Sequence, residues 1–150
     1  MEIIVVLDNI RSMHNIGSIF RSCDAMGNCS IVLCGICAIP PAKEIHKTAL
    51  GSTESVPWKY FRTTQEAIIE LKKNNYKIIT IEQTQNSIAL KKFKIQSQKI
   101  ALVFGNEVKG VNKEIIDLSE HCIEINQYGI KQSMNVSVVA GIVLWAIKNK

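Results

Sequence analysis

Three polar segments of this sequence carry the residues that could do chemistry. They cover residues 8–21, 105–110 and 126–135, and each adjoins an apolar run of the length of a buried strand. Because the carboxyl ends of parallel strands meet at one edge of a sheet, we expect the three segments to lie together there and to line a ligand pocket.

The first segment offers Asn15 and Arg21, six residues apart around the start of a predicted helix. A guanidinium group can bind a phosphate through two parallel N–H donors, so Arg21 is a candidate phosphate ligand. Taken singly, a surface arginine and a helix-capping asparagine are the commoner explanations of these residues. Phosphate binding at Arg21 is therefore a hypothesis that needs support from the other segments.

The second segment, GNEVKG, follows the strongest predicted strand at residues 100–104. Gly105 and Gly110 permit positive φ and close approach of the backbone, and they enclose Glu107. A tight turn with a solvated carboxylate would explain the segment equally well. It matches neither GxGxxG nor GxxxxGK[ST], so a dinucleotide site or a P-loop has no support from a motif.

The third segment ends at Ser133 and Asn135, where a strongly apolar helix begins. Their side chains face the same space as the free N–H groups of the first helical turn. One face of this helix has the spacing of a core-facing stripe, with Val136, Val139, Ala140, Val143, Leu144 and Ile147. A second apolar face, with Val138, Ile142 and Trp145, needs another packing partner, for which another subunit is a candidate.

The composition favours one globular domain at residues 1–150, since 47% of the residues are hydrophobic and 21% are charged. No run of about 18 apolar residues is present, so we expect no membrane span. The start MEIIVVLDNI lacks a basic n-region, which favours a cytoplasmic protein. A net charge of +5 permits a polyanionic partner without requiring one.

The cysteines and histidines give no sign of a metal or redox site. Five cysteines in a chain without an export signal indicate reduced thiols. Cys34 and Cys37 form a CxxC pair, but prolines follow it where a redox motif would open a helix. The three histidines show no ligand spacing, so we expect structural thiols and no metal.

Apolar runs of strand length alternate with helical patterns along the chain. We expect strands at residues 3–7, 30–33, 56–62, 77–81, 100–104 and 122–125. We expect helices from the region of Ile16 to residue 26, at 63–75, at 111–118 and from 136 onward, with a helical turn near 43–47, whereas 86–93 fits neither pattern. This alternation predicts an α/β fold with a mainly parallel sheet and helices on both faces.

Together the three segments resemble the motifs of the SpoU/TrmH-type RNA 2′-O-methyltransferases of the SPOUT superfamily. The matching stretches are NIGSIFRSCDA from Asn15, FGNEVKG from Phe104, IEI from Ile123 and SMNVS from Ser133, with KTALGS from Lys47 between the first two. Each stretch is short, but their order and spacing are specific and they cover nearly the whole chain.

The resemblance implies an α/β fold whose C-terminal part is tied in a deep trefoil knot, an exception to the usual topology rules. It also implies S-adenosylmethionine as the methyl donor, RNA as the substrate and a homodimer that forms through the C-terminal helix. Many relatives carry an added RNA-binding domain, and we expect this chain to act without one. Transfer RNA is then favoured over ribosomal RNA, because a minimal dimer covers a small area.

Carried over by position, the resemblance implies that S-adenosylmethionine contacts mainly backbone groups. The implied cofactor-binding residues are Thr80 or Ile81, Gly105, Gly110 as support for the loop, Ile125, Ser133 and Met134. The implied catalytic or RNA-positioning residues are Asn15, Arg21, Glu107 and Asn135. The ribose 2′-hydroxyl would attack the sulfonium methyl group, with Arg21 orienting a phosphate, because a guanidinium is a poor general base.

Two positions of the third motif depart from the family pattern. Asn126 stands where a proline is usual, which frees the unbound loop and is expected to weaken cofactor affinity. Met134 stands in place of leucine at similar volume, so we expect the packing to be retained.

Two other functions compete with RNA methylation. A catalytically silent RNA-binding protein on the same fold is the main alternative, although Arg21, Glu107, Ser133 and Asn135 are all present. A nucleotide-dependent oxidoreductase is a more distant one, since the GxGxxG motif is missing.

Overall fold

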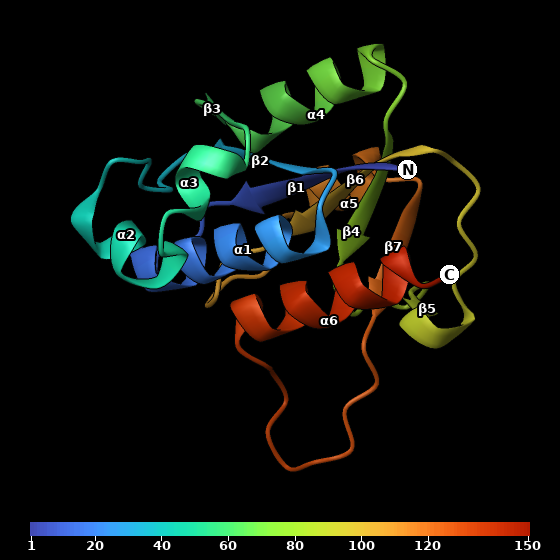
Figure 1. Ribbon diagram of the computed structural model, residues 1–150. Coiled ribbons are helices and arrows are strands. Elements are labelled where there is room, and N and C mark those ends of the chain that lie inside the picture. The colour runs from blue at the N-terminus through green and yellow to red at the C-terminus, as the bar shows by residue number, and fades with distance from the viewer.

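The sheet of this protein contains seven strands, and every pairing between neighbours is parallel. In the computed structural model, which describes all 150 residues, the strands are β1 (Glu2–Asp8), β2 (Cys29–Cys34), β3 (Trp58–Phe61), β4 (Lys77–Ile81), β5 (Ile88–Ala89), β6 (Lys99–Phe104) and β7 (His121–Glu124). They lie in the order β3-β2-β1-β6-β4-β7-β5 (Figure 1). Because all the strands are parallel, their carboxyl ends lie at the same edge of the sheet. There β6, from the second half of the chain, lies between β1 and β4.

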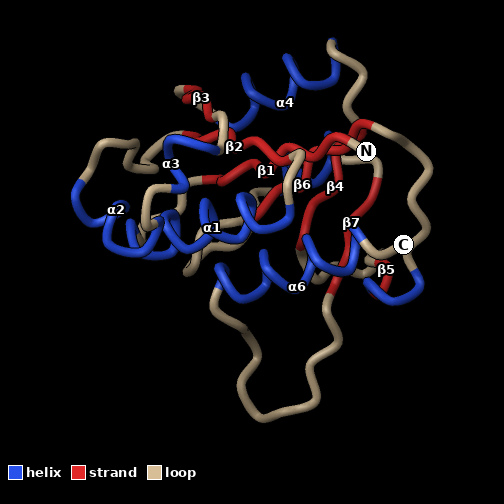
Figure 2. The backbone as a smooth tube through the Cα atoms, viewed as in Figure 1, coloured by secondary structure: helices blue, strands red, loops and turns tan.

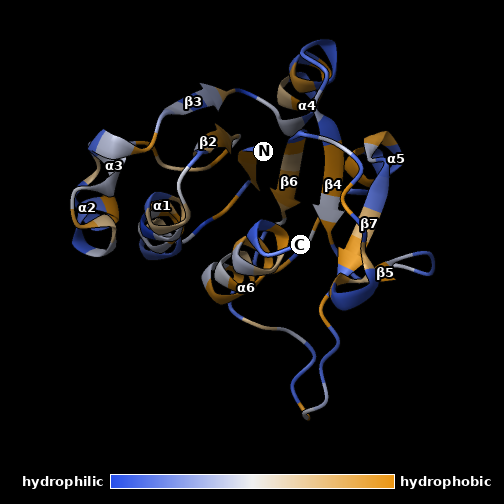
Figure 3. Cartoon of the chain, turned by 45° about the vertical axis from the view of Figure 1, so that its right-hand side comes forward, coloured by the Kyte–Doolittle hydropathy of each residue, from blue (hydrophilic) through white to orange (hydrophobic).

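Helices cover both faces of the sheet (Figures 2 and 3). They are α1 (Met13–Met26), α2 (Lys43–Ala49), α3 (Ser52–Ser55), α4 (Thr64–Lys73), α5 (Lys113–Leu118) and α6 (Val136–Lys148), and a 3₁₀ turn spans Leu90–Lys92. α1 and α6 lie side by side on one face, and α4 and α5 lie on the other (Figure 3).

Strand β1 shows why the sheet is buried on both faces. Successive side chains of a strand point to opposite faces, and here both sets are apolar. Ile3, Val5 and Leu7 belong to a cluster of 27 buried residues under α1 and α6. Ile4 and Val6 belong to a second cluster, of 13 buried residues, under α4 and α5. This accounts for the unbroken apolar run that the sequence shows there.

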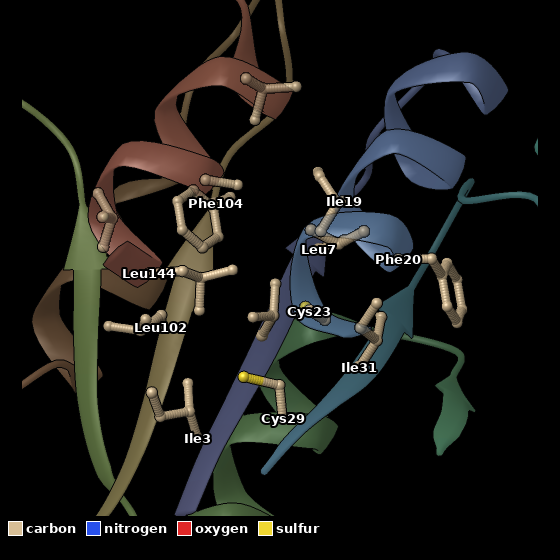
Figure 4. Packing of buried hydrophobic residues seen from close by; sticks show 14 of the residues in the cluster. Ile3, Leu7, Ile19, Phe20, Cys23, Cys29, Ile31, Leu102, Phe104 and Leu144 are labelled. Carbon is tan, nitrogen blue, oxygen red and sulfur yellow. The ribbon is translucent and has the colours of Figure 1, made fainter. Parts of the chain in front are cut away.

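The larger cluster joins the two helices that flank the candidate site. Phe20 of α1 and Leu144 of α6 are fully buried: Leu144 lies near Leu102 of β6, and Phe20 lies near Ile31 of β2 (Figure 4). All five cysteines are free, and four of them are buried. Burial is the main cause that raises the pKa of the Cys34 thiol, to about 12, as expected for a structural thiol.

The α/β fold and the mainly parallel sheet predicted from the sequence are confirmed, and the six predicted strands differ from the observed ones by at most two residues at either end. Three details differ. The helical turn expected near residues 43–47 extends to α2, α3 was not predicted, and the undecided stretch 86–93 contains the two-residue strand β5 followed by a 3₁₀ turn. Short elements such as α3 and β5 depend on tertiary contacts, which local patterns do not contain.

Helix α1 begins earlier than expected, at Met13, and its N-cap is Ser12. The Ser12 hydroxyl accepts a hydrogen bond from the backbone N–H of Asn15 (3.1 Å). Asn15 is therefore inside the first turn, and the interpretation of Asn15 as a cap is wrong. At the other end Gly27 closes the helix with φ +65°.

Helix α6 follows a long exposed loop that projects from the sheet edge (Figures 1 and 2). Tyr128 and Ile130 near the tip of this loop are almost fully exposed. α6 is very apolar, yet neither it nor another helix combines the length and hydropathy that a membrane crossing demands.

Candidate active site

A cavity of about 860 Å³ opens at the carboxyl ends of β4, β6 and β7. Its wall comes from the segments that follow these three strands, from the residues leading into α6, and from Asn15 at the start of α1. This is the edge at which open parallel sheets bind ligands. The three polar segments predicted from the sequence all contribute to it.

Glu107 connects the loop after β6 to the start of α1. Its two carboxylate oxygens accept the backbone N–H groups of Arg11 and Ser12, each at 2.9 Å. Burial raises the pKa of this carboxyl, but the two N–H donors, helped by the Asn15 side chain, outweigh burial and hold the pKa below its ordinary value. The carboxylate therefore stays ionised where free backbone donors gather.

Asn106 fixes the same loop through its side-chain amide. Its amide nitrogen donates to the carbonyl oxygen of Asn9 (2.6 Å), and its amide oxygen accepts the N–H groups of Val108 (2.9 Å) and Lys109 (3.0 Å). The loop after β6 is thus tied to the loop after β1 by two adjacent side chains, Asn106 and Glu107.

Glu82 ties the other end of this loop to β4. Its Oε2 accepts the N–H of Val111 at 3.1 Å, and its Oε1 accepts the N–H of Gln83 at 3.1 Å. A Cβ on Gly110 would lie 2.4 Å from Oε2, at a backbone φ of +67°. A residue with a side chain at position 110 would therefore be strained and would displace the carboxylate.

The wall of the cavity combines an apolar area with an excess of negative charge. The apolar part includes Ile81 and Ile123, paired partners in neighbouring strands, together with Phe104 and Ile125. The charged side chains are Glu82, Glu107, Glu124 and Lys109, three carboxylates and one ammonium. Such a wall suits a ligand with a flat apolar part and positive charge.

Nine of the eleven residues that the sequence singled out line this cavity. They are Asn15, Ile81, Gly105, Glu107, Gly110, Ile125, Ser133, Met134 and Asn135. Asn135 is the N-cap of α6, and its amide oxygen accepts the N–H of Ser137 at 2.8 Å. Its amide nitrogen is then the group that it can offer to a ligand.

Thr80 and Arg21 do not line the cavity. Thr80 is fully buried in β4, and its hydroxyl shares a hydrogen bond of 2.6 Å with Ser119. Arg21 is exposed on the outer face of α1, in a polar hollow of about 410 Å³ that also includes Ser18, Ser22, Ala25, Lys47 and Thr48.

The expectation that the whole first segment joins one pocket is therefore wrong for Arg21 within a single chain. It lies six positions after Asn15 in the helix, about 9 Å further along the axis. Asn15 lies in the turn at the sheet edge, whereas Arg21 lies further along the helix and faces outward.

Sequence reasoning did not single out several polar residues of the wall, among them Glu82, Asn106 and Glu124. Glu82 directly follows a predicted strand, so its position at a strand end was the available signal. Asn106 lies inside the noted GNEVKG segment, but nothing local shows that its partner is Asn9, 97 residues away.

The second apolar face of α6 is exposed, as the sequence pattern predicted. The exposed fractions of Val138, Ile142 and Trp145 are 50%, 38% and 60%. This face adjoins α1, because Gly141 of α6 lies opposite Ser22. It is the largest apolar side-chain group on that pair of helices that has no partner within the chain.

Comparisons with known proteins agree on one family. The family model described as the SpoU rRNA methylase family matches residues 2–145. The tRNA (guanosine(18)-2′-O)-methyltransferase of Aquifex aeolicus is 30% identical over 148 residues, which cover 96% of this chain and 67% of that protein. A putative TrmH family tRNA/rRNA methyltransferase of Staphylococcus aureus (strain MSSA476) is 25% identical and covers all of this chain.

A solved structure gives the same result for the fold. The AdoMet-bound rRNA methyltransferase from Sinorhizobium meliloti superimposes with a TM-score of 0.90 at 26% identity, over 99% of this chain and 56% of that chain. The chain spans 60% of the staphylococcal relative's length, so these relatives are longer proteins.

We predict that Glu107→Gln lowers stability at neutral pH but not in acid. The pKa of Glu107 is depressed in the folded state, so its contribution is present above the ordinary carboxyl pKa of about 4.3 and is lost as pH falls through the folded value. Urea unfolding of both proteins from pH 7 to pH 3 should give free energies that converge in acid. Glu54→Gln, at an exposed carboxylate of α3, is the control. A difference that is constant with pH would contradict this role.

Proposed function

We propose, because the chain belongs to the SpoU rRNA methylase family, that it transfers the methyl group of S-adenosylmethionine to a ribose 2′-hydroxyl of RNA. The observation that carries this proposal is the cavity, whose wall is formed by the segments that bear the family's motifs. The relatives' names support RNA methylation, and the ribose position and the methyl donor are part of the proposal.

The residues of the cavity fit S-adenosylmethionine chemically. Its adenine needs a flat apolar area, which the partly exposed Ile81, Ile125 and Met134 provide. Its sulfonium and ammonium groups are positive, and the cavity wall carries three carboxylates and only one lysine, so its net charge is negative. When bound, the cofactor supplies an electrophilic methyl group on a positively charged sulfur.

The chain's own residues then have to hold the RNA and place its 2′-hydroxyl. Asn15 and Asn135 line the cavity from the starts of α1 and α6, and Glu107 binds the backbone just before α1. Amide and backbone donors there can orient a ribose and its phosphate. Positioning of this kind accounts for much of the rate of a bimolecular transfer.

We assign to Arg21 the binding of an RNA phosphate. A guanidinium stays protonated at physiological pH, so it cannot accept the proton of the 2′-hydroxyl. Its planar donors suit a phosphate, and Arg21 supplies the unpaired positive charge of the hollow, since Lys47 there is ion-paired with Glu44 at 3.0 Å. The phosphate oxygen that Arg21 orients can relay the proton away from the ribose.

We further propose a homodimer that forms through α6, with Arg21 serving the cavity of the partner. The exposed apolar face of α6 supports the dimer, because a closed symmetric pair would bury it. Arg21 lies outside the cavity of its own chain and next to that face, since Ser22 lies opposite Gly141.

We also propose the C-terminal trefoil knot of the SPOUT fold for this chain. The strand order supports it, because β6 is inserted between the earlier strands β1 and β4, and β7 lies beside β4. The loops after β6 and β7 would then be both the knot and the cavity wall.

Methyl transfer from labelled S-adenosylmethionine to unmodified RNA tests the proposed reaction. We expect transfer RNA to accept label more readily than ribosomal RNA, because the relative from Aquifex aeolicus is a tRNA (guanosine(18)-2′-O)-methyltransferase. Label should appear in alkali-resistant dinucleotides, since a 2′-O-methyl group blocks alkaline cleavage. Label in mononucleotides would contradict ribose methylation. Cofactor binding that never leads to label on any RNA would favour the alternative, a catalytically silent RNA-binding protein.

We predict that Arg21→Ala reduces turnover by about 100-fold or more, which is typical for loss of one positioned charge donor. S-adenosylmethionine affinity should not change, because Arg21 does not line the cavity. A doubly tagged heterodimer then pairs one Arg21→Ala chain with one Gly105→Val chain. Gly105→Val disrupts the cavity of its own chain, because a Cβ at position 105 would lie 2.6 Å from the Gly110 carbonyl carbon. About half of wild-type activity should return, because the cavity of the Arg21→Ala chain receives Arg21 from its partner and forms one intact composite site. An inactive heterodimer would place Arg21 at its own chain's cavity.

We predict that Trp145→Glu converts the wild-type dimer to a monomer at micromolar concentration. A buried carboxylate without a partner is costly at an apolar interface, and Trp145 is the largest and most exposed residue of this face of α6. Ile69→Glu is the matched control, because Ile69 is similarly exposed on α4 at the opposite face. Sedimentation equilibrium gives the mass of each. A monomeric wild type, or a dimeric Trp145→Glu variant, would contradict this interface.

A further inference from the structure

Glu82 is the one cavity carboxylate that directly follows β4, an interior strand of the sheet. Its backbone N–H donates to the carbonyl oxygen of Ile123 at 3.0 Å, which continues the pairing of β4 with β7. Its side chain is partly buried and is held by the N–H groups of Gln83 and Val111. Both the main chain and the side chain of Glu82 are therefore fixed before a ligand arrives.

Each oxygen of this carboxylate still has an acceptor position available. An ionised carboxylate has about four lone-pair positions, and the two N–H donors use one on each oxygen. Two acceptor positions, side by side, then remain for a ligand. Two neighbouring hydroxyl groups on a five-membered sugar present donors at a matching spacing, which is how acidic side chains at strand ends hold ribose.

The position of Glu82 in the wall indicates which part of a nucleoside it meets. Ile81 precedes it, and Ile125 follows the strand whose Ile123 pairs with Ile81, so the partly exposed side chains of Ile81 and Ile125 offer apolar area close to Glu82 in the same wall. The group bonded to a nucleoside base is the ribose. A ligand whose base lies on these isoleucines therefore brings its ribose to the carboxylate.

We infer that Glu82 binds the ribose 2′,3′-diol of the adenosine part of the cofactor. This inference rests on the proposed function, because the adenosine in question is that of S-adenosylmethionine. It assigns Glu82 to cofactor recognition, in addition to holding Val111. It also accounts for Gly110, since any Cβ there would overlap the Glu82 carboxylate.

The test compares ligands as well as variants, so that recognition is separated from loop support. Isothermal titration calorimetry measures binding of S-adenosylhomocysteine and of its 2′-deoxy and 3′-deoxy analogues. For the wild type we expect each analogue to bind about tenfold more weakly, as for a lost hydrogen bond to a charged group. For Glu82→Gln the ratio should fall to about threefold or less.

Glu124→Gln is the matched control. Glu124 lines the same cavity, and its Oε2 accepts the Ser87 hydroxyl at 3.1 Å, so this change removes an equal charge from the wall. We expect this variant to retain the tenfold preference for the intact diol. Thermal unfolding of each variant without ligand establishes that it is folded before titration.

The possible results separate the two proposals. A wild type that binds no S-adenosylhomocysteine would overturn the proposed function. A wild type that binds it, with the same diol preference in Glu82→Gln, would overturn the role of Glu82 alone. Equal weakening of all three ligands in Glu82→Gln would reduce Glu82 to a support for the loop, and equal loss of preference in Glu124→Gln would reduce the effect to charge.

Discussion

The loop after β6 is the part of this protein on which the site depends, because three side chains fix it to the rest of the sheet edge. Glu107 binds the backbone at the start of α1, Asn106 binds the carbonyl of Asn9, and Glu82 binds Val111 at the other end of the loop. These bonds join segments about 30 and 100 residues apart in sequence. Without them, the carboxyl ends of β1, β4 and β6 would carry three independent loops and no common cavity wall.

The same arrangement divides the site into regions with different tasks. The apolar ends of β4 and β7 suit a nucleoside base, and the carboxylates around them suit a positively charged ligand. The starts of α1 and α6 offer amide and backbone donors on another side, where we place the RNA. Arg21 lies beyond this wall, beside the exposed apolar face of α6, so a second copy completes the site in our account.

Local sequence was sufficient to predict the parallel sheet and the three polar segments of the cavity wall, whereas Ile81, Ile125 and Met134 were assigned through the family resemblance. Buried strands such as β1 are continuous apolar runs, and polar residues at their carboxyl ends necessarily meet at one edge. It was not sufficient for Thr80, whose position one residue before the end of β4 leaves it buried. Local sequence also could not show that Arg21 faces away from the cavity, because the orientation of α1 on the sheet is a tertiary property. Nor could it identify Asn9 as the partner of Asn106, because the two residues are 97 positions apart.

The central claim is that the segments after β4, β6 and β7 form one site for S-adenosylmethionine. Amide hydrogen exchange with and without S-adenosylmethionine tests it most directly, since it reports each segment separately. We expect slower exchange at residues 82–84, 105–111 and 126–135, and little change in α4 on the opposite face of the sheet. Unchanged exchange in these three segments, or protection confined to other parts of the chain, would contradict the account.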